Sequence, residues 1–146
     1  MSVAATIISF LLLLILKSLL RLDFFPAFVV YLAVLNGPET TILCSSFAGF
    51  IQDALFFPGF LNFLSYTVVG GLAVYLKRFF AFEKDALALT LVLIAAPASV
   101  LIVALSMRLF EGAVYPGLIL SLIKVTVLNG VLVFIVNHFF GLNDRQ

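Results

Sequence analysis

The stretch GFIQDALFFPGFLNFLSYTVVGG, Gly49 to Gly71, places one carboxylate, Asp53, inside an otherwise apolar segment. The apolar run breaks at Pro58-Gly59 and then resumes. An ionised Asp at the centre of a membrane-spanning helix costs about 2.5 to 3.5 kcal/mol, so such residues usually face protein or water rather than lipid. The stretch therefore predicts two apolar helices, with Asp53 on an inward or lumen-facing surface.

The composition of the whole chain indicates an integral membrane protein. Hydrophobic residues make up 64% of the 146 residues, charged residues only 10%, and the mean hydropathy is +1.30. These values lie far from the usual balance of a soluble domain. Because each helical crossing needs about 20 residues, the chain has room for five or six spans and for no soluble catalytic domain.

Apolar runs alternate with short clusters of Gly, Pro, Asn and charged residues, which is typical of helices joined by tight turns. We therefore expect an all-α polytopic membrane protein, a single domain over 1–146 with about six transmembrane helices in one compact bundle. The expected spans are about 3–20, 24–35, 40–57, 60–76, 86–107 and 118–139. The second span rises only about 18 Å. It must include flanking residues, lie in a thinned bilayer, or be sheltered by its neighbours.

The distribution of basic residues favours an orientation with both termini in the cytoplasm. On this assumption four basic residues lie inside and two outside, namely Lys77, Arg78, Lys84 and Arg145 against Arg21 and Arg108.

The same orientation gives several ionisable residues a common depth in the outer part of the bundle: Lys17, Arg21, Asp23, Asp53 and Lys124. One polar cluster could hold them all. Pairing of Asp53 with Lys17 or Lys124 would remove much of the insertion penalty, and the fourth span could add hydrogen bonds from Asn62, Ser65 and Tyr66.

Three interpretations of Asp53 remain open: a structural ion pair or helix-packing site, a contact with a partner protein, and a site for a transported solute or proton. Transporters usually show several buried acids or broken helices. Here the candidates are one acid and one short span, so we favour the structural interpretation.

The chain lacks the residue patterns of an enzyme site. His138 is the only histidine and Cys44 the only cysteine. His138 has no second His or Cys within helical reach, so we expect a ring at the membrane interface rather than a metal ligand. The serines lack a histidine partner, and Gly70 and Gly71 form no phosphate-binding fingerprint. We therefore expect no catalytic, cofactor or metal site, and no nucleic-acid partner.

Polar, Gly and Pro residues between Arg21 and Arg78 follow a recognisable order. The pattern runs Arg21-x-Asp23, Tyr31, Gly37-Pro38, Phe47-Ala48-Gly49-Phe50-Ile51-Gln52-Asp53, Pro58-Gly59, Ser65-Tyr66, Gly70 and Lys77-Arg78. Together with the length and the number of spans, it resembles the family of the bacterial rod-shape-determining protein MreD. The chain departs from that family at Leu22, where Pro is frequent, and at Gly49-Phe50, where a Gly-Leu pair is common.

This resemblance implies a non-enzymatic scaffold of the inner membrane that maintains cell shape within the peptidoglycan elongation machinery. The implied partners are MreC, the MreB filament, the glycan polymerase RodA, an elongation-specific penicillin-binding transpeptidase and membrane lipids. Arg21, Asp23 and Asp53 would be sensitive to partners or define the fold, while Lys77 and Arg78 would orient the inner face. All five could instead serve only topology and folding.

The alternative belongs to another class, the substrate-binding S component of an energy-coupling-factor vitamin transporter, which also has about six spans and a similar architecture. A vitamin site needs several convergent polar and aromatic groups in an outer pocket. Coupling also calls for an Ala-x-x-x-Ala face on the first span. This chain has Ala4 and Ala5 followed by bulky Ile and Leu, so that face is missing.

Overall fold

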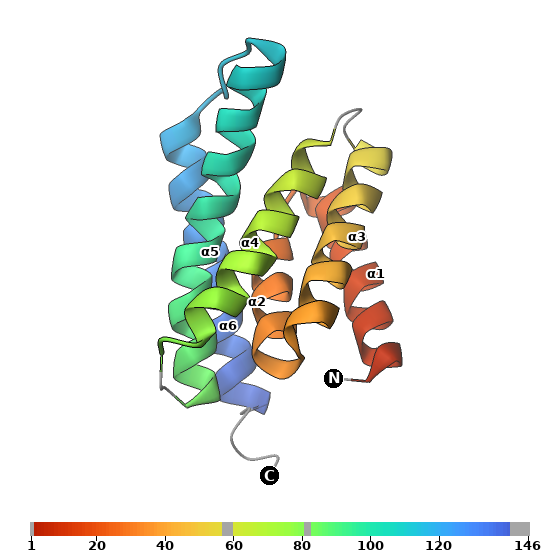
Figure 1. Cartoon of the computed structure of the whole chain (residues 1–146), viewed down its shortest axis with the longest axis vertical. Helices are drawn as coiled ribbons and strands as arrows, with labels where there is room; N and C mark the ends of the chain where they lie inside the picture. The colour runs from red at the N-terminus through yellow and green to blue at the C-terminus, as the bar shows by residue number, and fades with distance from the viewer. Residues whose placement is uncertain (1, 57–59, 81–82, 141–146) are drawn as a thin grey trace.

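The computed structural model describes residues 2–56, 60–80 and 83–140, and over these ranges the chain is all-helical. The elements are α1 (Val3–Leu20), α2 (Phe25–Leu35), α3 (Pro38–Phe56), α4 (Leu61–Lys77), α5 (Lys84–Ser106), the π-helical turn η1 (Met107–Glu111) and α6 (Leu118–Phe140) (Figure 1). The all-helical class is confirmed, and each element begins within two residues of its expected start. The fifth is longer than expected because η1 carries it to Glu111. The expected boundary at Phe57, the Pro58-Gly59 break and Arg145 lie outside the described residues.

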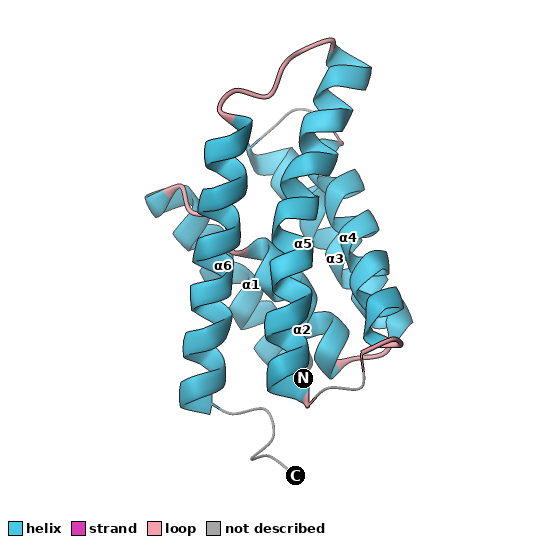
Figure 2. Ribbon diagram, turned by 90° about the vertical axis from the view of Figure 1, so that its left-hand side faces the viewer, coloured by secondary structure: helices cyan, strands magenta, loops and turns pink. Residues whose placement is uncertain are grey.

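Three of the described helices are long and apolar enough to cross a membrane: α1, α5 together with η1, and α6. α2 is apolar but shorter. The apolar helices are compatible with a membrane protein. α1 begins and α6 ends at the same end of the molecule (Figures 1 and 2).

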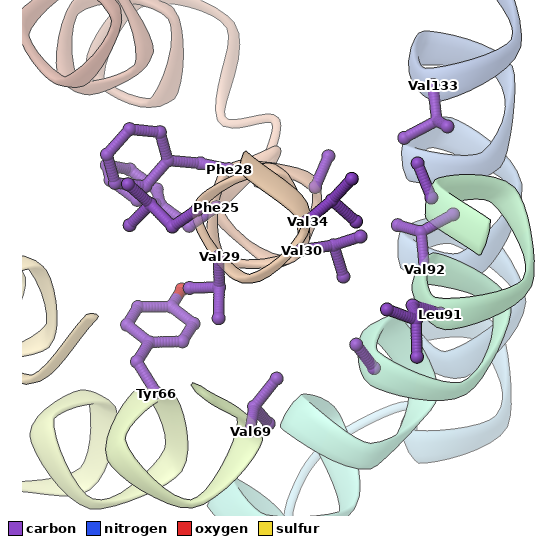
Figure 3. Packing of buried hydrophobic residues seen from close by; sticks show 14 of the residues in the cluster. Phe25, Phe28, Val29, Val30, Val34, Tyr66, Val69, Leu91, Val92 and Val133 are labelled. Carbon is purple, nitrogen blue, oxygen red and sulfur yellow. The ribbon is translucent and has the colours of Figure 1, made fainter. Parts of the chain in front are cut away.

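The short helix α2 lies at the centre of the bundle. Nine of its 11 residues are buried, and it packs against α3, α4, α5 and α6. Figure 3 shows Phe25 and Phe28 on one side of this helix, Val29 facing Tyr66 of α4, and Val30 on the side of α5 and α6. Of the three explanations for the short second span, shelter by neighbouring helices is therefore the one that the packing supports.

Close approach of α3 and α4 depends on small residues. A Cβ added at Gly49 would lie 2.5 Å from the carbonyl oxygen of Asn62 and 2.7 Å from the Cα of Phe63. A Cβ at Gly70 would collide with the hydroxyl of Ser45. Both contacts leave room for hydrogen only, so these glycines set the distance between the two helices.

α5 and α6 form a long antiparallel pair that extends beyond the other helices (Figure 1). The peripheral helix α1 has no fully buried residue and packs mainly through Phe10, Leu13 and Leu14 against the core. Its last residue is followed by Arg21 in the left-handed conformation, with φ 53°, which turns the chain toward α2.

Candidate functional site

Asp53 caps the N-terminus of α4. Its Oδ1 accepts a hydrogen bond from the N–H of Asn62 at 2.9 Å, and its Oδ2 accepts one from the N–H of Phe63 at 2.7 Å. The first N–H groups of a helix have no intrahelical partner, and the helix dipole favours a negative charge beside them. The carboxylate is 5% exposed. The acid is thus held by backbone donors of the next helix, which supports the helix-packing interpretation.

The expected pairing of Asp53 with Lys17 or Lys124 is therefore wrong. Lys17 Nζ lies 3.4 Å from Asp23 Oδ2, in the one ion pair found among the described residues. Lys17 also donates a hydrogen bond to Gln52 Oε1. Lys124 is exposed and has no side-chain partner in the described part of the chain.

A partly buried network links α1, α3 and α4 around Asp23. The hydroxyl of Tyr66 lies 3.1 Å from Asp23 Oδ2 and 3.3 Å from Gln52 Oε1, and the N–H of Phe25 donates to Asp23 Oδ1 at 3.1 Å. Gln52 is fully buried, and its Nε2 has no partner among the described residues. The sequence patterns did not predict this role for Gln52. The one hint was its position next to Asp53 in an apolar helix.

Asn129 joins α6 to this network. Its Oδ1 accepts from the N–H of Ala27 at 2.9 Å, and its Nδ2 donates to the carbonyl oxygen of Asp23 at 2.8 Å. Asn129 is fully buried. A buried amide that satisfies backbone groups of another helix fixes the register between the two helices. The sequence analysis did not predict a role for Asn129 either. The one hint was an isolated Asn in the middle of an apolar span.

A pocket of about 310 Å³ opens beside the network, at the end of the bundle where α1 ends and α6 begins. Four of the five ionisable residues expected at one depth line it: Lys17, Arg21, Asp23 and Lys124. Asp53 does not line the pocket but caps the helix that supplies Asn62, Ser65 and Tyr66 to its wall. The structure thus brings four of the five predicted residues to one pocket, while Asp53 has backbone partners instead of a lysine.

Lys77 and Arg78 lie at the opposite end of α4. Lys77 Nζ donates to the carbonyl oxygens of Ala33 at 2.8 Å and Val34 at 3.2 Å, near the C-terminus of α2. A cation is favourable there because the last carbonyls of a helix lack partners. Arg78 is exposed.

Among the described residues, no group of three His, Cys, Asp or Glu side chains is placed to hold a metal ion. The fold and the site define an all-helical bundle with a capped helical hairpin and a polar pocket at one end. Comparison of the chain with family models, with curated proteins and with solved structures found no match.

Proposed function

We propose that the chain is a multi-pass protein of the bacterial cytoplasmic membrane, with six helices in the bilayer and both termini in the cytoplasm. The apolar surface supports this proposal. Exposed large hydrophobic side chains lie along α1, α5 and α6, and also on the outer face of α3 at Leu43, Phe47 and Phe50. Several polar residues of α3 and α4 are instead buried, among them Asp53, Gln52 and Ser65.

Within that membrane, the proposed role is a non-enzymatic scaffold subunit of the MreD type in the cell-wall elongation complex. The observation that best supports this role is that residues of the MreD-like pattern contact one another in the fold. Asp23 binds Tyr66, Gly49 admits the backbone of α4, and Asp53 caps that helix. A pattern that specifies one packed arrangement is more selective than general hydrophobicity, because each position has its own steric or hydrogen-bonding demand.

The proposed partners are MreC, together with MreB, RodA and an elongation-specific penicillin-binding transpeptidase. A chain with such short loops offers them mainly helix surfaces. Exposed Leu, Ile and Phe side chains along α1 and α6 provide such surfaces. Because no α1 residue is fully buried, this helix can contact a partner helix through the face that does not pack against the core.

The test is affinity purification of the tagged protein from its own membranes in mild detergent, read by mass spectrometry. Recovery of MreC and the elongation synthases supports the scaffold. Asp53→Asn is run in parallel with Glu39→Gln, which removes an exposed acid at the other end of α3. Both variants are compared at equal amounts of folded protein, so that weaker partner binding can be distinguished from unfolding.

One observation favours a second candidate, the S component of an energy-coupling-factor vitamin transporter. The pocket contains convergent polar and aromatic groups, including Asn62, Tyr66 and Tyr115, as a vitamin site requires. The missing Ala-x-x-x-Ala face on α1 argues against it. Recovery of paired ATPases with a large transmembrane coupling subunit in the same purification would overturn the scaffold in favour of this candidate.

A further inference from the structure

The pocket holds cationic groups that the fold itself does not use. Lys17 and Asp23 neutralise each other across its wall. Arg21 and Lys124 line the same pocket, and neither side chain has a hydrogen bond or ion pair within the described ranges. Glu111 is the remaining charged residue of the lining. Two free cations against one carboxylate give the pocket an excess of positive charge.

Asn62 adds a neutral donor in the same place. This residue is only 9% exposed and lines the pocket. Among the described residues, the one hydrogen bond found for it uses its backbone N–H, which leaves the side-chain amide without a protein partner. Because Asn62 lines the open pocket, its side-chain amide can hydrogen-bond to a group that enters the pocket, either water or a ligand.

Part of the pocket lining is apolar. Val100 and Val103 of α5 and Leu128 of α6 belong to it. A ligand with an anionic head and an alkyl chain would suit both kinds of lining residue, since basic residues bind phosphate and the valine and leucine side chains would cover hydrocarbon. The free donors and the apolar wall belong to one cavity, so one molecule can meet both.

We propose that this pocket binds the phosphate headgroup of a membrane phospholipid, with Arg21, Lys124 and Asn62 contacting the phosphate and an acyl chain lying along α5 and α6. The site does not depend on the identity of the protein partners. Binding there would join α6 to the link between α1 and α2, because Arg21 lies in that link and Lys124 lies on α6.

The experiment is native mass spectrometry of the purified full-length protein titrated with three probes. Phosphatidylglycerol carries headgroup and chains, diacylglycerol carries the chains alone, and glycerol 3-phosphate carries the phosphate alone. The double variant Arg21→Asn/Lys124→Met removes both free cations. Asn suits position 21 because it tolerates the left-handed backbone found there. Arg78→Gln, which removes an exposed cation at the other end of α4, is the matched control.

We expect phosphatidylglycerol to bind the double variant at least tenfold more weakly than the native protein, because two charge-assisted hydrogen bonds are lost. Arg78→Gln should stay within twofold of native binding, and melting temperatures should be unchanged. Equal binding of phosphatidylglycerol to native protein and double variant would overturn the proposal. So would binding of diacylglycerol to the native protein as tightly as phosphatidylglycerol. Glycerol 3-phosphate binding as tightly as the lipid would overturn the lipid assignment and identify a soluble phosphate ester as the ligand.

Discussion

α1 and α2 are both apolar helices near the start of the chain, yet they occupy opposite environments. α1 has 18 residues and none is fully buried, whereas α2 has 11 residues and nine are buried. The short helix is enclosed by α3, α4, α5 and α6, while the long one lies at the periphery. Length and hydrophobicity alone therefore do not identify the core. A helix that is apolar all round can face either lipid or protein.

The largest expected effect comes from disturbing the contact between α3 and α4, two of the helices that pack around α2. Gly49→Ala should destabilise the protein by about 3 kcal/mol, because its Cβ would meet backbone atoms of α4 that cannot rotate away. Gly71→Ala is the control, since no atom lies within 4 Å of its added Cβ, and better helix propensity should leave it neutral or slightly stabilised. Thermal unfolding in detergent measures both. Equal melting temperatures would show that α3 and α4 do not approach so closely.

The second test compares the two helices directly. Leu32→Ala in α2 should lower the free energy of unfolding by about 2 kcal/mol, because Leu32 is fully buried and a cavity would remain. Leu12→Ala in α1 should have little effect, because Leu12 is 56% exposed and truncation opens no internal cavity. Unfolding by a denaturing detergent measures the difference. Similar losses in the two variants would contradict the central position of α2.

The third test concerns the cap that holds the hairpin. Asp53→Asn should cost about 1.5 kcal/mol, because an amide has one acceptor oxygen where the carboxylate has two and carries no charge to oppose the helix dipole. Glu39→Gln should cost only about 0.5 kcal/mol or less, because Glu39 is exposed in the first turn of α3 and has only the dipole of that helix to lose. Melting temperature is again the measurement. A neutral Asp53→Asn would mean that the carboxylate does not serve as the cap.

The smallest effect should come from loosening α1. Lys17→Met removes the ion pair with Asp23 and the hydrogen bond to Gln52, and should cost about 1 kcal/mol, because Asp23 and Gln52 both keep Tyr66 as a partner. Hydrogen–deuterium exchange should rise in α1 and stay unchanged in α2. Lys124→Met should change neither. Increased exchange in α2 after Lys17→Met would show that the two helices are stabilised together.

Sequence patterns predicted much of the fold and only part of the site. Apolar runs between turn residues located the helices, because helix length and turn chemistry are local properties. The common depth of Lys17, Arg21, Asp23 and Lys124 followed from helix order and agrees with the pocket. The partner of Asp53 could not be found this way, since backbone N–H groups are the same at every residue except Pro. Gln52 and Asn129 act through contacts between distant segments, and a sequence pattern does not encode which helices meet.

The cap on α4 also has a consequence for the order in which α3 and α4 become stable as the chain is made. Asp53 depends on donors that follow it by nine and ten residues, so those donors are synthesised later than the acid they stabilise. Until they emerge, α3 carries an uncapped carboxylate that disfavours transfer into lipid. For a chain inserted into a bilayer, we therefore expect α3 and α4 to integrate as a pair.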